Sequence, residues 1–117
     1  MTIREASLRC DISPETLRYY EQISMIPPIK RNIKGIRDYT EEDCKWIAFI
    51  KAMRIAGVST EDLSGYLKMC ALGDEAIIKR RIFLIEQYSS IMGRIEKLWE
   101  ISKIIDEQLN YHKNQTI

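Results

Sequence analysis

The stretch Ser13-Pro14-Glu15-Thr16-Leu17-Arg18-Tyr19-Tyr20-Glu21 decides the fold of this chain. It predicts a short helix, because a serine caps the free N–H groups of a first turn and a proline suits the first helical position. Leu17 and Tyr20 follow helical spacing and are expected to point inward. The outward face carries polar side chains suited to reading DNA: Glu15, Thr16, Arg18 and Tyr19. Taken alone, the stretch also fits an amphipathic core helix with solvated polar residues.

A basic segment follows this helix. Pro27-Pro28 end the helix, and two β-prone runs, Ile29-Lys30-Arg31 and Ile36-Arg37-Asp38-Tyr39, flank a loop that contains Gly35. This pattern predicts a β-hairpin. No acidic residue lies between Gln22 and Arg37, whereas the segment holds four cations: Lys30, Arg31, Lys34 and Arg37. A basic hairpin after a helix-turn-helix is typical of a wing, whose cations contact phosphates. A hairpin charged only to resist aggregation is the alternative.

The composition limits the function classes. The chain has 117 residues, about one domain, and a net charge of +1. Residues 1–58 hold ten Lys/Arg against eight Asp/Glu, and residues 59–117 hold eight against nine. The sequence predicts no membrane span and no signal peptide, and its three cysteines suit a reducing cytoplasm. A single histidine, without a nucleophile set or a phosphate-binding glycine loop, indicates that the protein is not an enzyme.

Capping signals divide the rest of the chain into helices. The first helix is predicted over residues 3–9, and Thr40-Glu41-Glu42-Asp43 has the form of a capping box that opens another. Gly57 is expected to end that helix, Ser59 to cap the next, and Gly73 to interrupt the chain. From Asp74 to about His112 we expect one helix of roughly 39 residues, about 58 Å long. The predicted domains are residues 1–72 and residues 73–117.

The long helix carries an apolar seam. Its spacings alternate between four and three residues, which is typical of a coiled coil. A helix this long cannot cover its own apolar surface, so a partner is needed, and the simplest partner is a second copy of the chain. The predicted dimerisation residues are Leu84, Tyr88, Ile91, Ile95, Leu98, Ile105 and Leu109.

These motifs together resemble the mercury-resistance-regulator (MerR) family of bacterial transcription factors. The resemblance rests on the first quoted stretch, on Pro27-Pro28, on the runs 35–39 and 40–43, and on residues 49–59. It implies a mainly α fold: a winged helix-turn-helix DNA-binding domain with a short β-hairpin wing, then a long coiled-coil helix that pairs antiparallel in a homodimer. Asp11 and Ser24 stand where the family often has glycine, and both residue types tolerate turn conformations.

A DNA interface and a mechanism follow from this resemblance. Regulators of this family bend and untwist an over-long promoter spacer so that RNA polymerase can bind both promoter elements. We expect contacts to phosphates and base edges from the recognition helix and contacts to the DNA backbone from the wing, where Arg37 could also reach the minor groove. Lys51 and Arg54 are further candidates. The predicted DNA-binding residues are Thr16, Arg18, Tyr19, Lys30, Arg31, Arg37 and Tyr39.

The signal that such a regulator answers is less defined. The nearest resemblance is the aldehyde- and electrophile-responsive branch, but Ala52 stands where that branch has a cysteine in the third helix. The long helix has no cysteine, so neither a metal nor a cofactor is expected. Cys70 is interpreted as a small buried hydrophobe, and the reactivity of Cys44 stays open. A small effector would need a pocket at the dimer interface, near Tyr66, Tyr88 and Trp99.

Two other functions fit the same motifs. One is a DNA-architectural protein or repressor that has the reading helix and the wing but no effector. The other is a coiled-coil protein-interaction module whose helix-turn-helix binds protein. The basic segment argues against this second alternative.

Overall fold

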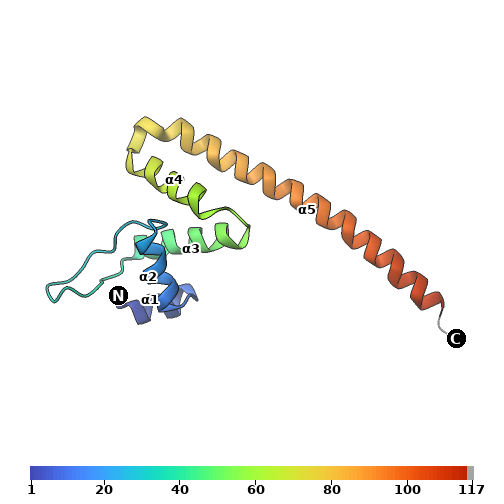
Figure 1. The fold of residues 1–117 in the computed structure, drawn as a ribbon, viewed down its shortest axis with the longest axis horizontal. Helices are drawn as coiled ribbons and strands as arrows, with labels where there is room; N and C mark the ends of the chain where they lie inside the picture. The colour runs from blue at the N-terminus through green and yellow to red at the C-terminus, as the bar shows by residue number, and fades with distance from the viewer. Residues whose placement is uncertain (116–117) are drawn as a thin grey trace. The chain divides into compact units, whose positions relative to one another are not determined.

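A computed structural model of the protein describes residues 1–115. It is mainly helical, with five α-helices and one 3-10 turn in the described part (Figure 1). The chain forms two compact units, Met1–Arg80 and a second that begins at Arg81. The predicted domain boundary at residues 72 and 73 lies earlier in the chain and stays a prediction.

The first two helices form the helix-turn-helix. Helix α1 spans Ile3–Cys10 and has a complete capping box between Thr2 and Glu5. Helix α2 spans Pro14–Gln22, and its cap Ser13 accepts a hydrogen bond from the backbone N–H of Thr16, as predicted. The turn between them places Asp11 in the left-handed region at φ 51°, and Ser24 adopts φ 60° after α2. Both non-glycine residues therefore adopt the turn conformations expected of them.

The segment between α2 and α3 is a loop and contains no strand, unlike the predicted hairpin. The two β-prone runs do pair antiparallel, but only through one isolated bridge between Arg31 and Arg37. The turn is closed locally, because the Asn32 side chain accepts hydrogen bonds from the N–H groups of Lys34 and Ile36. Gly35 supplies the positive φ of 78° that this turn needs. The ladder is too short to form strands.

Two further helices complete the core of the first unit. Helix α3 spans Glu41–Ile55 and begins with the predicted capping box of Thr40 and Asp43. Helix α4 spans Thr60–Ala71 and is capped by Ser59. Helices α1 to α4 lie together in the first unit (Figure 1), and their inward side chains form its hydrophobic core. Its fully or almost fully buried side chains include Ala6, Leu17, Met25, Ile26, Ile47, Ile50 and Leu63.

The cap of α3 gives a first testable prediction. Thr40→Ala removes the side chain that accepts a hydrogen bond from the N–H of Asp43, at 3.1 Å. We expect the free energy of unfolding to fall by about 1 kcal/mol, the usual effect of losing an N-cap. Urea denaturation followed by circular dichroism measures this change. Thr60→Ala, in the first turn of α4 but not at its cap, is the matched control, and an equal loss in both variants would contradict the assignment.

The last helix is long and is preceded by a short turn. Gly73–Ala76 form a 3-10 helix, and α5 spans Ile77–Asn114, so the long helix begins three residues later than predicted. Its 38 residues correspond to about 57 Å. No described residue of α5 is buried within the single chain. Residues 1–115 contain no helix with the length and apolarity that crossing a bilayer requires.

Candidate nucleic-acid interface

Helix α2 separates a buried face from an exposed face. Leu17 and Tyr20 are buried in the core, as predicted. Arg18 is exposed, and Tyr19 has 52% of its surface accessible. Thr16 is half-buried, and its hydroxyl lies 2.8 Å from that of Ser13, so it also takes part in the cap. The exposed face therefore presents one guanidinium group and one phenol to the solvent.

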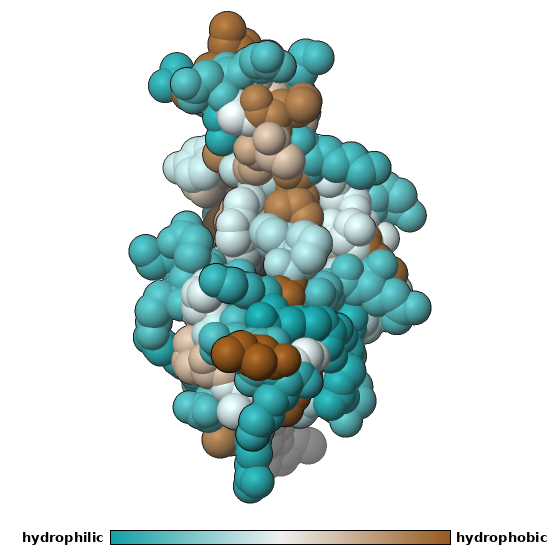
Figure 2. All heavy atoms as spheres, turned by 90° about the vertical axis from the view of Figure 1, so that its left-hand side faces the viewer, coloured by the Kyte–Doolittle hydropathy of each residue, from teal (hydrophilic) through white to brown (hydrophobic). Residues whose placement is uncertain are grey.

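The loop of residues 29–39, called here the basic loop, projects beside this helix. Lys30, Arg31 and Lys34 are exposed on it. The Arg31 guanidinium donates a 2.9 Å hydrogen bond to the carbonyl oxygen of Gly35, which ties the side chain to the turn. Figure 2 looks onto the side from which this loop projects, where hydrophilic side chains predominate around a few hydrophobic ones. Exposed cations on a loop beside a helix suit contact with a phosphate backbone.

Arg37 and Glu21 fasten the basic loop to α2. The Nε of Arg37 donates a 2.8 Å hydrogen bond to Oε1 of Glu21, and the two side chains are only 26% and 16% exposed. Oε2 of Glu21 accepts a second hydrogen bond from the N–H of Ile29 at 3.1 Å. One carboxylate thus binds both ends of the loop. Arg37, predicted as a DNA contact, has this ion pair within the protein, and its contact with DNA stays a prediction.

The protonation of Glu21 is shifted by these contacts. Burial raises the pKa of Glu21, but the hydrogen bonds from Arg37 and Ile29 outweigh it and hold the pKa below its ordinary value. The hydrogen bond with Glu21 in turn raises the pKa of Arg37. Since the pKa of Glu21 is lowered on folding, its ionised form stabilises the fold above the ordinary carboxyl pKa. This stabilisation is lost as the pH falls through the lowered value.

Glu21→Gln should therefore remove part of the acid sensitivity of the fold. At neutral pH we expect a loss of about 1 to 3 kcal/mol of stability, because a hydrogen-bonded charge is replaced by a neutral amide. As the pH falls through the lowered pKa of Glu21, the difference from wild type should shrink. Urea denaturation at several pH values measures both effects. Glu15→Gln, an exposed glutamate on the same helix, is the control and should change little. A pH-independent difference would refute the role given to the carboxylate.

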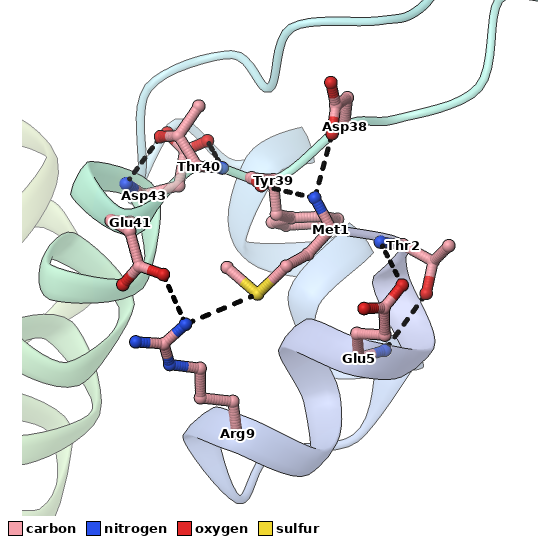
Figure 3. Close-up of polar contacts among 9 residues, drawn as sticks. All are labelled: Met1, Thr2, Glu5, Arg9, Asp38, Tyr39, Thr40, Glu41 and Asp43. Atoms are coloured by element: carbon pink, nitrogen blue, oxygen red, sulfur yellow. Dashed lines mark hydrogen bonds and ion pairs between the residues drawn. The ribbon is translucent and has the colours of Figure 1, made fainter.

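Tyr39, predicted as a DNA contact, is buried in the structure. Its side chain is only 2% exposed, and burial raises its pKa. The backbone of Tyr39 forms two hydrogen bonds with Met1. The N–H of Tyr39 donates to the Met1 carbonyl oxygen at 2.8 Å, and the Met1 ammonium donates to the Tyr39 carbonyl oxygen at 2.7 Å. The ammonium also pairs with Asp38 at 2.9 Å (Figure 3). Tyr39 thus anchors the end of the basic loop in the core, and its contact with DNA stays a prediction.

Lys51 and Arg54 are the further candidates for DNA contacts. Both side chains form hydrogen bonds with backbone carbonyl groups of the protein itself. The ammonium of Lys51 donates hydrogen bonds to the carbonyl oxygens of Cys10 and Asp11, at 3.2 and 2.6 Å. Arg54 donates to the carbonyl of Val58 at 2.7 Å. Lys51 thus holds the C-terminus of α1 on α3. The sequence held no signal for the contacts of Lys51, because its partners lie 40 and 41 residues away.

Side chains that could bind a metal ion are scattered over the described residues. Within residues 1–115, no three His, Cys, Asp or Glu side chains lie together in a way that could hold a metal ion. Ala52, at the position of the expected cysteine, is exposed on α3. Cys44 is buried, with 8% of its surface accessible, and Cys70 is half-buried.

Two capped helices joined by a tight turn, followed by a basic loop and a supporting helix, define a helix-turn-helix protein. Comparison with known proteins specifies the family. The family model of the MerR HTH family regulatory proteins matches residues 1–70. The chain therefore belongs to the MerR family.

Relatives with curated names are transcriptional regulators. The HTH-type transcriptional regulator AdhR of Bacillus subtilis is 45% identical over 87 residues, which cover 74% of this chain and 62% of AdhR. The matched part is thus less than two thirds of that relative. The mercuric resistance operon regulatory protein of Bacillus cereus is 28% identical, over 88% of this chain and 78% of that protein.

Solved structures share the fold over nearly the whole chain. A MerR family regulator from Listeria monocytogenes superposes with a TM-score of 0.92 at 36% identity, covering 97% of this chain and 86% of the other. HiNmlR, described as a MerR family regulator lacking the sensor domain and bound to promoter DNA, gives a TM-score of 0.90 at 23% identity. That match covers 97% of this chain and 90% of HiNmlR and supports the fold alone.

Proposed function

We propose that the protein is a dimeric, sequence-specific DNA-binding transcription regulator that distorts its promoter. The observation that carries the proposal is the exposed pair Arg18 and Tyr19 on α2, beside a basic loop that Glu21 holds in place. Helix α2 would enter the major groove, where an arginine distinguishes guanine by two hydrogen bonds or binds phosphate. Thr16 would lie beside these contacts at the first turn.

The basic loop would act as the wing. Lys30 and Arg31 are exposed and would contact the phosphate backbone on one side of the groove. Arg37 would keep its ion pair with Glu21 and reach DNA with the remaining N–H groups of its guanidinium. Because the loop is tied to α2 by Glu21, the wing and the recognition helix would approach DNA in a fixed arrangement.

Helix α5 would provide the dimer contact. Its predicted seam residues lie on a helix that buries none of them within the chain, and Leu98 is 63% exposed. A seam of isoleucine and leucine on a 38-residue helix is stable in water only when another helix covers it. An antiparallel coiled coil of two copies would give a two-fold symmetric protein and hence an inverted-repeat DNA site. In this proposal residues 1–72 bind DNA and residues 73–117 dimerise.

The regulatory step would be a change of DNA shape. A dimer that bends and untwists an over-long spacer brings both promoter elements onto one face for RNA polymerase. Smooth bending of such a site costs about 1 to 6 kcal/mol. A small-molecule effector, if it drives this step, must favour the distorting conformation by a comparable difference in affinity. The proposal needs neither a metal nor a catalytic residue, and it places the protein with promoter DNA in the bacterial cytoplasm.

Selection from a random DNA pool tests this proposal. The purified full chain is incubated with the pool at moderate salt, and the retained DNA is sequenced. An enriched inverted repeat would support a dimer that reads two half-sites. Its position between over-spaced promoter elements in the source genome would support activation by untwisting, whereas normal spacing would favour a repressor without an effector. If no DNA sequence is retained above background, the DNA-reading assignment is wrong and a protein-interaction module is favoured.

A further inference from the structure

The chain has two cysteines that lie far apart in sequence but come together in the fold. Cys10 is the last residue of α1, and Cys44 lies in the first turn of α3. Their side chains interact, and both line the same surface hollow with Arg9, Glu41, Lys45 and Ala48. Both are free thiols. Cys10 is half-buried at this hollow, and Cys44 lies deeper.

Contacts on both sides of the thiol pair hold α1 against α3. Arg9, the residue directly before Cys10 in the chain, forms an ion pair with Glu41 of α3 (Figure 3). Lys51 of α3 donates hydrogen bonds to the carbonyl oxygens of Cys10 and of the next residue, Asp11. The backbone that carries the Cys10 thiol is therefore fixed next to the helix that carries the Cys44 thiol. A disulfide requires two cysteine side chains that lie side by side, and these two line the same hollow.

We propose that Cys10 and Cys44 form a redox-active dithiol that a low-molecular-weight disulfide oxidises to an intramolecular disulfide between α1 and α3. The Cys10 thiolate, which is the more accessible, attacks one sulfur of the reagent, forms a mixed disulfide and releases one thiolate. The Cys44 thiolate then attacks the Cys10 sulfur and releases the second thiolate. The two cysteines lose two electrons, the reagent gains them, and the two thiol protons pass to the released thiolates.

The surroundings make this pair slow to react at neutral pH. Burial raises the pKa of Cys10 to about 11, helped by Cys44 and opposed by Arg9 and Lys51. From α3, the acidic Glu41 and the basic Lys45 also face the hollow. Only a small fraction of Cys10 is thiolate at pH 7, and reaction depends on the thiolate. The oxidation should therefore be faster at pH 9 than at pH 7.

The disulfide would close a covalent ring that contains the DNA-reading part of the chain. Residues 11–43 lie inside this ring, and they include α2 and the basic loop. A disulfide restricts the unfolded chain, so the oxidised protein should unfold at a higher temperature. The expected rise in Tm is on the order of 10 °C, and reduction should reverse it.

The experiment uses the reduced full chain and oxidised glutathione under native conditions. Tryptic mapping should then find peptide 10–18 linked to peptide 38–45, and the Cys70→Ala variant should give the same link. In Cys44→Ala, Cys10 should stop at the mixed disulfide with glutathione. In Cys10→Ala, Cys44 should stay reduced. Circular dichroism checks that each variant is folded.

Two results would overturn the proposal. One is that Cys10 and Cys44 both remain free thiols in the folded wild-type protein after prolonged exposure at pH 9. The other is that the only disulfide formed joins Cys70 residues of two chains. The wild-type and Cys70→Ala proteins decide this even where Cys44→Ala does not fold. The outcome is independent of DNA binding, so the proposal can fail without affecting the proposed function.

Discussion

Replacement of Arg18 by alanine is expected to weaken binding to the selected DNA site by about 1 to 3 kcal/mol. The side chain is exposed on α2, so the loss should come from the DNA complex and not from the fold. Alanine is a better helix former than arginine, so α2 itself should be preserved. Fluorescence anisotropy with labelled DNA at fixed salt measures the affinity, and circular dichroism measures the stability.

The control for this variant removes the same charge elsewhere. Lys103 is exposed on α5 and lies outside the predicted seam, so Lys103→Ala should leave DNA affinity nearly unchanged at the same salt concentration. If both variants weaken binding equally, Arg18 contributes only net charge. A variant that binds normally, or that loses its helical signal, would show that α2 presents a different face to DNA.

Leu98→Asp should convert the dimer into monomers. In the proposed coiled coil the leucine lies in the apolar seam, where an unpaired carboxylate would lose its water. The free chain tolerates the change because this position is exposed in a single copy. Sedimentation or light scattering of the variant should give the mass of one chain. DNA affinity should fall sharply as well, because the two half-sites are then bound independently.

A carboxylate on the outer face of the same helix is the matched control. Ser90 is exposed on α5 and lies outside the predicted seam, so Ser90→Asp should stay dimeric. A dimeric Leu98→Asp would mean that the seam is misplaced along the helix or that another surface joins the copies. Dissociation of both variants would indicate a general effect of negative charge on α5.

Local signals in the sequence predicted the helices well. The caps Ser13, Thr40 and Ser59 each accept the expected hydrogen bond from the third residue after them. Asp11 and Ser24 adopt the left-handed conformation that their place in tight turns required. Such features depend on neighbours within a few residues, so a single sequence contains the whole interaction. The start of α5 was placed three residues early, because Gly73 is followed by a 3-10 turn.

The sequence by itself thus determined the capped starts of α2, α3 and α4, the inward face of α2, the basic character of the following loop and the family. Only the tertiary structure decided which of the marked side chains are exposed and which have partners within the protein. It buried Tyr39, paired Arg37 with Glu21 and brought Cys10 to Cys44. These contacts join residues 16 or more positions apart and exist only after the helices pack. Side-chain type and spacing therefore could not reveal them.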